Sequence, residues 1–206
     1  MSIGNLLRVV PPPERPGDPF PGPWRDIEAK LGTALPSDYK AFVRAYGRGK
    51  FMGHIWIWTP RAWDPYDRLE SMAPTVLKLF REDEDFTFPL WPEPGGLLPF
   101  GSTLDGDYLA WTTYGSPDDW TVTVLDRGMG YQEAHTYGCG MTDFLAGVAT
   151  GEIGAPAFHP GILECEHLFI PNPRGPDPVV EIGWRLGPFG GSGTSTSRLG
   201  RSQSGS

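Results

Sequence analysis

The stretch LPSDYKAFVRAYG, residues 35–47, constrains the fold more than any other part of this chain. Pro36 suits the first turn of a helix, where its missing N–H would have no partner, and Gly47 suits the position after the last turn. Ser37 and Asp38 place acceptor oxygens beside the other free N–H groups of that turn. A helix this short is unstable alone in water, so we expect a β-sheet to cover its apolar face. That face consists of Tyr39, Phe42, Val43 and Tyr46.

The rest of the pattern predicts further helices and a set of short strands. The apolar spacing of an amphipathic helix recurs over 24–31, 73–82 and 141–151. The connections between the expected strands are short, which favours an antiparallel meander. β-Branched and aromatic residues, partly in period-two alternation, place these strands at 54–58, 107–113, 120–126 and 131–137, with peripheral strands at 168–170 and 179–184.

The chain contains 28 glycines and 23 prolines among 206 residues, which favours one turn-rich α+β domain over a helical bundle. We place this domain at 24–151. Proline is abundant in 11–23, so we expect 1–23 to be an extended leader after which the fold begins. A C-terminal extension, 152–189, follows the domain, and packing on the domain is one alternative for it. Residues 190–206 are rich in glycine and serine, which is typical of a flexible tail.

The net charge of −8 bears on the kind of partner. It repels phosphate backbones and anionic lipid heads, which disfavours direct binding of nucleic acid or membrane, and it favours encounters with a basic protein. The N-terminal apolar run is shorter than a signal-peptide core, and no window approaches the ~20 apolar residues that span a bilayer. We therefore predict a cytoplasmic protein with Cys139 and Cys165 reduced, and a bond between them stays an alternative.

The sequence contains no recognisable catalytic or nucleotide-binding motif. It contains no nucleophile elbow, no P-loop and no dinucleotide-binding fingerprint. Cys165 and His167 form only a weak zinc-type pair. We therefore predict no metal site and no cofactor, and a protein that is not an enzyme.

Two pairs of acidic residues at predicted turns admit a structural and a chemical interpretation. Asp is common in tight turns, because its side chain accepts hydrogen bonds from nearby backbone. Successive turns of a meander fall at opposite ends of the sheet, so the pairs 105/107 and 118/119 should lie roughly 15–20 Å apart, which disfavours a shared metal site. The least favoured hypothesis is a carboxylate-dependent hydrolase. It would use Asp105, Asp107, Asp126 and Glu133.

Candidate partner-binding residues fall into three groups. The tryptophans of the strand 54–58 share one face and are either core or interface residues. The acidic run 82–85 is either a solvated helix end or a mimic of the phosphate charge that a basic cleft expects. Acidic residues at turns complete the set. The candidates are Trp56, Trp58, Glu82, Asp83, Glu84, Asp85, Asp105, Asp118 and Asp119.

An ordered series of positions within 24–151 also occurs in a known family. The positions are Trp24, Glu28, Leu35, Pro36, Tyr39, Phe42, Gly47, Gly101, Gly106 and Asp107. In this order the chain resembles the SUKH superfamily, which includes yeast cell-wall-assembly regulators and bacterial immunity proteins. The resemblance implies an α+β domain with helices packed on a mainly antiparallel sheet, in which these residues are mainly structural.

The resemblance, the acidity and the missing reaction motifs together favour protein binding. We expect a non-enzymatic immunity protein that binds and neutralises a basic toxin domain of the nuclease or nucleic-acid deaminase class. The alternative is a protein-binding regulatory adaptor of the cell-wall-regulator type, in which the proline-rich leader presents an extended ligand. The leader and the residues after Gly151 lie outside the family pattern.

Overall fold

The computed structural model describes residues 3–128, 130–154, 156–158, 160–164 and 168–172. The chain divides into two units, Met1–Pro176 and Asp177–Ser206, and every described residue belongs to the first. Three expectations therefore lie outside the described residues. They are the strand 179–184, the tail 190–206 and the pair Cys165 and His167.

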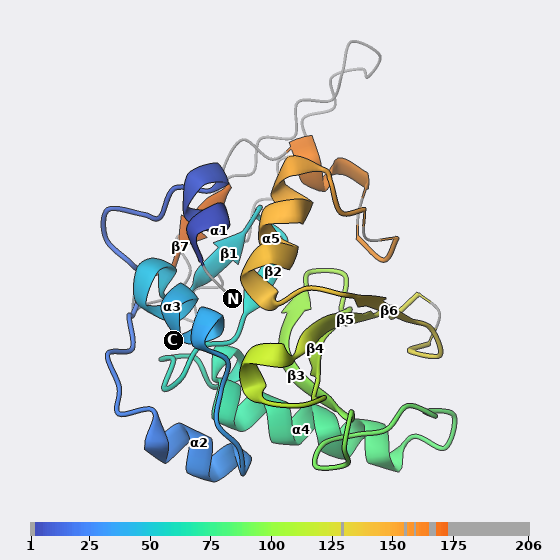
Figure 1. Cartoon of the computed structure of the whole chain (residues 1–206). Coiled ribbons are helices and arrows are strands. Elements are labelled where there is room, and N and C mark those ends of the chain that lie inside the picture. Colours follow the sequence, from blue (N-terminus) through green and yellow to red (C-terminus); the bar gives the residue numbers. More distant parts are fainter. Residues whose placement is uncertain (1–2, 129, 155, 159, 165–167, 173–206) are drawn as a thin grey trace, which may run out of the picture. The chain divides into compact units, whose positions relative to one another are not determined.

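The described part of the chain is built on a seven-stranded antiparallel sheet (Figure 1). In space the strands follow the order β6-β5-β4-β3-β2-β1-β7. The first six strands form a meander, as predicted, but β1 and β3 were not among the predicted strands, and β3 lies between β2 and β4. β7 returns to pair with β1. The predicted α+β fold is confirmed. The strands are β1 (Gly49–Phe51), β2 (Ile55–Ile57), β3 (Leu97–Thr103), β4 (Tyr108–Thr112), β5 (Thr121–Leu125), β6 (Ala134–Tyr137) and β7 (Phe169–Pro171).

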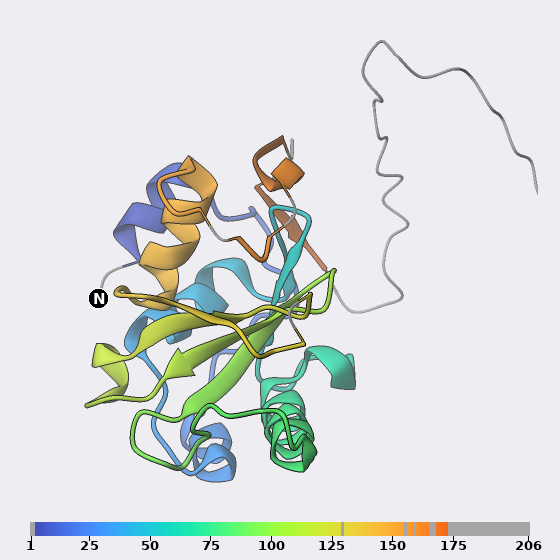
Figure 2. The same ribbon diagram turned by 90° about the vertical axis from the view of Figure 1, so that its right-hand side faces the viewer.

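Helices cover both faces of this sheet. They are α1 (Gly4–Val9), α2 (Arg25–Leu31), α3 (Ser37–Tyr46), α4 (Leu69–Glu82) and α5 (Met141–Thr150), with 3-10 turns η1 (Pro65–Asp67), η2 (Pro117–Asp119) and η3 (Pro160–Glu164). Tyr108 and Trp111 of β4 point to opposite faces, because side chains alternate along a strand. The Trp111 ring lies 5.2 Å from Tyr39 of α3, and the Tyr108 ring lies 5.5 Å from Phe80 of α4. Figure 2 shows the sheet between these layers, with α5 on the α3 side.

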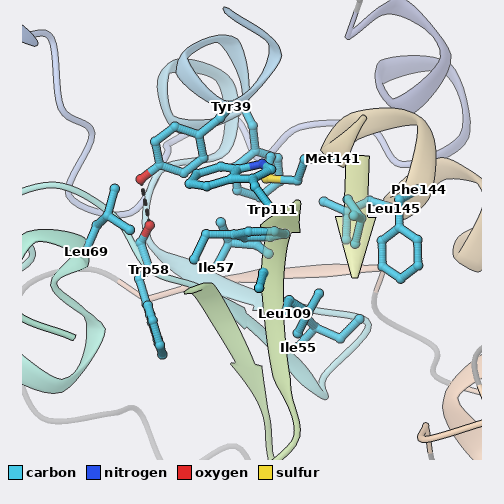
Figure 3. Close-up of a cluster of buried hydrophobic side chains, with 14 of the residues drawn as sticks. Tyr39, Ile55, Ile57, Trp58, Leu69, Leu109, Trp111, Met141, Phe144 and Leu145 are labelled. Carbon is cyan, nitrogen blue, oxygen red and sulfur yellow. Dashed lines mark hydrogen bonds between the residues drawn. The ribbon is translucent and has the colours of Figure 1, made fainter. Parts of the chain in front are cut away.

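The core on the α3 side confirms the helix predicted at 36–46 (Figure 3). All four apolar residues of its predicted face are completely buried and pack in one cluster with β2, β4 and α5. The Tyr39 hydroxyl donates a hydrogen bond of 2.7 Å to the carbonyl of Trp58. Burial raises the pKa of Tyr39 well above its ordinary value, so the hydroxyl keeps the proton that it donates.

The cap of α3 differs from the sequence expectation. Pro36, the residue before the helix, offers no side-chain cap, and the N–H of Ser37 donates instead to the carboxylate of Asp118 in η2 at 2.6 Å. Asp38 is buried, and its Oδ2 accepts the backbone N–H and the hydroxyl of Thr142 in α5 at 3.0 and 3.2 Å. Each of these two helices is thus capped by a carboxylate from another element.

The fold begins earlier than we expected. Segment 11–23 contains no helix or strand, as predicted, but α1 precedes it, and Leu6, Val10 and Phe20 are buried in the main core. A Cβ on Gly17 would overlap the carbonyl oxygen of Arg48. The N-terminal residues are therefore packed onto the domain. The helical pattern of α1 spans less than two turns, which is too short to show a period.

Element boundaries also differ in places. Helix α4 begins at Leu69, before the predicted range 73–82, and Pro74 lies inside it. Proline removes one intrahelical hydrogen bond, but the buried face that includes Leu69 and Ala73 continues across it, so packing decides the outcome. Strands β2 and β6 are shorter than the predicted strands that contain them.

Candidate protein-interaction surface

Asp107 holds the turn between β3 and β4 together. Its Oδ2 accepts the Thr103 hydroxyl at 2.6 Å, and its Oδ1 accepts the N–H of Arg127 at 3.0 Å. Its own N–H donates to Thr103 Oγ1 at 3.0 Å, and the adjacent Gly106 has a φ of +95°, which favours glycine. Asp107 is only 2% exposed, so it joins two turns at one end of the sheet and does not face a partner.

Other carboxylates at this end of the sheet reach the surface. Asp105 and Glu133 are exposed, and Asp126 is half-buried. Asp105 Oδ2 lies 3.5 Å from His54 Nε2, and Asp126 accepts a backbone N–H of its own turn at 2.6 Å. The Arg127 guanidinium donates to the backbone carbonyl of Asp105 at 3.1 Å, and not to its carboxylate. The turn therefore presents net negative charge.

The acidic run 82–85 starts at the last residue of α4. Glu82, Glu84 and Asp85 are exposed, whereas Asp83 accepts the N–H of Asp85 at 3.0 Å and holds the turn. Among the described residues, the one ion pair of this run joins Lys78 and Glu82 at 3.6 Å. Both side chains of this pair are exposed, so it contributes little to stability and leaves most of the charge uncompensated.

An aromatic cluster joins this run to the β3–β4 turn. The ring of Phe86 stacks on Phe80 at 4.2 Å, and Phe80 contacts Tyr131 at 5.4 Å. The Tyr131 hydroxyl donates to the carbonyl of Gly106 at 2.9 Å, and burial raises the pKa of Tyr131 to about 12, so this donor stays protonated. The run and the turn thus lie at one end of the sheet. We call this the acidic end, and it consists of Glu82, Asp83, Glu84, Asp85, Asp105, Asp126 and Glu133.

Asp118 and Asp119 lie at the opposite end of the sheet, because β3, β4 and β5 pair antiparallel in sequence order. Asp118 accepts the N–H of Ser37, and this hydrogen bond lowers the pKa of Asp118. Asp119 Oδ2 accepts the Ser116 hydroxyl at 2.7 Å and the Ser116 N–H at 3.2 Å, which forms a capping box around η2. These two candidates therefore serve local structure and are not grouped with Asp105.

The two candidate tryptophans differ in access. Trp58 is 1% exposed, and its ring packs against Tyr108 on the α4 side of the sheet, so its proposed role in partner binding is wrong. The aromatic pattern of 54–58 could not predict which of the two tryptophans is covered by α4. Trp56 is half-buried, with Lys50 Nζ 4.6 Å from its ring centre and the Arg48 guanidinium at 6.0 Å. Because the side chains of Lys50 and Arg48 lie over its ring, Trp56 offers little apolar area to a partner protein.

Positions that carry the family resemblance hold the domain together. Glu28 accepts the N–H of Leu35 at 2.9 Å and pairs with Lys40 at 2.5 Å, which fastens the loop between α2 and α3. Burial raises the pKa of Glu28, but the hydrogen bonds from Lys40 and Leu35 outweigh it, so the pKa lies below its ordinary value. Trp24 packs edge-on against Tyr39 at 6.0 Å. Leu35, Pro36 and Phe42 belong to the same buried layer.

Two glycines of the resemblance allow backbones to approach closely. Gly47 has a φ of +66°, and a Cβ there would overlap the backbone of Gly17. A Cβ on Gly101 of β3 would overlap the carbonyl oxygen of Trp56 in β2. The sequence positions with the clearest pattern therefore belong to the core and to close backbone contacts, and not to a reactive site.

Two surface features lie outside the predicted set of candidate residues, although the tryptophan of the first, Trp63, was considered as either a core or an interface residue. The loop 59–68 exposes Trp63 and Tyr66. A depression of about 470 Å³ lies between α1 and α5 and is lined in part by Arg8, Cys139 and Asp143. Burial raises the pKa of the Cys139 thiol, with a smaller contribution from nearby carboxylates. Neither feature has a periodic sequence signal, because one is an irregular loop and the other depends on the unpredicted α1.

The described residues contain no group of three or more His, Cys, Asp or Glu side chains placed to hold a metal ion. In the same part of the chain, no helix has both the length and the apolar character that crossing a bilayer requires.

Together these features define an α+β domain whose clustered polar groups lie on an open surface. The family model SUKH_6, described as SMI1-KNR4 cell-wall, matches residues 22–145, which is more than half of the chain, and the chain belongs to this family. The SUKH resemblance is therefore confirmed. In general this family consists of non-enzymatic immunity and regulatory proteins that act through protein–protein interaction. No curated protein and no solved structure matches the chain.

Proposed function

We propose that this chain is a cytoplasmic immunity protein that binds and neutralises a basic toxin domain through the acidic end. The observation that carries this proposal is the gathering of the run 82–85 with Asp105, Asp126 and Glu133 at one end of the sheet. Toxin domains that cleave or deaminate nucleic acid have basic clefts, because their substrates are polyanions. A surface that repeats the substrate's charge can occupy such a cleft and exclude the substrate.

The acidic end is suited to this role for two reasons. Its carboxylates are mostly exposed and weakly compensated, because within the described part of the chain Lys78 is the one cation paired with the run, and His54 is the one group paired with Asp105. The segments that carry the charges are also joined by packing, since Phe80 contacts both Phe86 and Tyr131. A fixed array of negative charge raises the association rate with a basic partner and favours one orientation.

The first experiment is affinity capture of the tagged protein from its native cells, with salt titration of the complex and mass spectrometry. We expect one stoichiometric partner with a basic nuclease- or deaminase-like domain, and release at high salt. The variant Glu84→Lys/Asp85→Lys should lose most of this capture. The matched control Glu93→Lys/Glu152→Lys makes the same charge change at exposed positions outside the acidic end and should retain it. Several weak partners, or equal losses in both variants, would reject the proposal.

A regulatory adaptor of the cell-wall type is the second candidate, and the description of the matching family favours it. The version in which the leader presents a free ligand is less well supported. Leu6, Val10 and Phe20 are buried, so deletion of 1–23 should destabilise the domain as well as remove a ligand. Loss of capture in that deletion would therefore need a folding control before it counted for the adaptor.

The hydrolase hypothesis has the weakest support. Asp107, one of its four proposed carboxylates, is buried and engaged by Thr103 and Arg127. Its hydrogen bonds leave it poorly placed to act as a general base. Calorimetry with divalent cations tests the metal-dependent version, and measurable binding that Asp105→Asn abolishes would revive it.

A further inference from the structure

The loop 59–68 between β2 and α4 is held firmly in place. At its base, the N–H of Thr59 donates to the carbonyl of Asp67 at 2.9 Å. Inside the loop, the guanidinium of Arg68 donates twice to the carbonyl of Ala62, at 3.0 and 2.8 Å. A loop that is fixed by its own hydrogen bonds loses little entropy when a partner binds.

Neighbouring elements fix the same loop from outside. Arg48, which is almost completely buried, donates from Nε to Asp67 Oδ2 at 2.6 Å and lies 3.8 Å from Asp64. The carboxylate of Asp18, in the proline-rich segment, accepts the N–H of Trp63 at 3.2 Å. The conformation of the loop is therefore enforced by Arg48, which precedes β1, and by the N-terminal segment.

This rigid loop holds two large aromatic side chains in solvent. Trp63 is 53% and Tyr66 is 76% exposed, and within the described part of the chain neither ring contacts another ring or a cation. Tyr114, at 73% exposure, differs because its ring lies against Gly95. Trp and Tyr are enriched among the residues that dominate the energetics of protein interfaces. The loop therefore has the composition and the rigidity of an interface element.

Charges around the loop nearly cancel. Arg48 contacts Asp64 and Asp67, and Arg61 lies 3.2 Å from Asp26. Two copies of a chain with net charge −8 repel each other, and the repulsion is smallest where the facing surfaces are neutral. This loop is therefore better suited than the acidic end to contact a second copy.

The proline-rich segment, which reaches the loop at Asp18, supplies a complementary kind of surface. Pro11 and Pro12 are exposed, and the same segment continues to Asp18, which bonds the loop through Trp63. Extended proline-rich segments bind against exposed aromatic rings in many recognition domains. A chain that carries both exposed rings and exposed prolines can pair with a second copy of itself, each copy offering its rings to the prolines of the other, which is the self-complementarity that a twofold interface requires.

We propose that two copies of this chain pair across a twofold axis through this surface. Trp63 and Tyr66 of each copy would pack against residues 11–16 of the other. The contact carries no net charge, because Glu14 and Arg15 of this segment offset each other, in contrast to the acidic end. The pairing does not depend on the proposed toxin partner, and each copy would keep its own acidic end.

Sedimentation velocity of the full chain over a range of concentrations tests the pairing. We expect a monomer–dimer equilibrium that persists at high salt, because the packing of rings against prolines is apolar and screening affects it little. The variant Trp63→Ala/Tyr66→Ala should weaken the dimer about thirtyfold, as expected for the loss of interface hot spots. The matched control Tyr114→Ala removes an equally exposed aromatic ring elsewhere and should leave the equilibrium unchanged.

A second variant examines the other half of the contact. Pro11→Ser/Pro12→Ser should also weaken the dimer, and circular dichroism melting shows whether each variant is folded. A chain that stays monomeric at all concentrations overturns the proposal. So does a dimer that is insensitive to Trp63→Ala/Tyr66→Ala, or one that is sensitive to it but not to the proline substitutions.

Discussion

Acidic residues at the two ends of the sheet differ in whether the fold supplies hydrogen-bond donors to their carboxylates. At the η2 end, Asp118 accepts the N–H of Ser37 and Asp119 accepts the hydroxyl of Ser116. At the acidic end, the carboxylates of Glu84 and Asp85 make no hydrogen bond or ion pair within the described part of the chain. The comparison shows that the donors which the fold brings to a carboxylate decide its role. Bound carboxylates stabilise the domain, whereas unbound ones are available for a partner.

Asp38 is the bound carboxylate with the largest expected effect. It is 2% exposed and accepts the N–H of Tyr39 at 2.7 Å as well as the N–H and hydroxyl of Thr142. We expect Asp38→Ala to lower the free energy of unfolding by about 3 kcal/mol, because buried donors lose their acceptor. Urea denaturation measures this change. Asp38→Asn keeps the volume and one acceptor oxygen and should cost less, so equal losses would contradict the explanation.

Asp118 tests the comparison through pH. Its folded-state pKa lies below the ordinary 3.8, mainly because of the hydrogen bond from Ser37, so its stabilisation is present above 3.8 and is lost as pH falls through the folded pKa. We expect Asp118→Ala to lose about 1 kcal/mol at neutral pH, as for a helix cap. The difference from the wild-type chain should shrink below pH 3.8.

Unfolding curves at several pH values, with Asp85→Ala as the matched control, measure this effect. The control should differ little from the wild-type chain at any pH, since no described residue donates to the carboxylate of Asp85. A difference for Asp118→Ala that stays constant through the acid range would show that the helix cap does not depend on the ionised carboxylate.

The sequence predicts those features of this fold that are local. Helix α3 was predicted because Pro36, its apolar face and its terminal glycine all lie within 35–47, although the carboxylate that caps it comes from Asp118. The strands β4 and β5 were predicted because alternation over five residues is a local signal. Helix α1 was not, since six residues show no period and its stability comes from packing on the core.

Whether a given carboxylate is bound or unbound could not be predicted, because the deciding contacts are distant in sequence. Ser37 and Asp118 are 81 positions apart, and Asp38 and Thr142 are 104 apart. The same limit applies to the candidate surface. The run 82–85 was found as a charge pattern, but its grouping with Asp105 depends on aromatic contacts between α4 and the β5–β6 turn.

The smallest expected effect on stability belongs to the acidic end, where Glu84→Gln/Asp85→Asn removes charge and keeps side-chain size. We expect the free energy of unfolding to change by less than about 0.5 kcal/mol, because no donor loses its acceptor. A slight gain is the expected direction, since four consecutive acidic residues repel one another. Denaturation at low salt, where this repulsion is least screened, gives the clearest measurement.

The variant Glu84→Gln/Asp85→Asn should weaken binding to a basic partner, although it hardly changes the stability of the domain. Removing unbound surface charge lowers the rate of association with a basic partner and leaves the dissociation rate largely unchanged, because steering acts before contact. Stopped-flow association at two salt concentrations separates these rates once the captured partner is in hand. A stability loss as large as that of Asp118→Ala would mean that the acidic end is also structural, and the contrast between the two ends would then disappear.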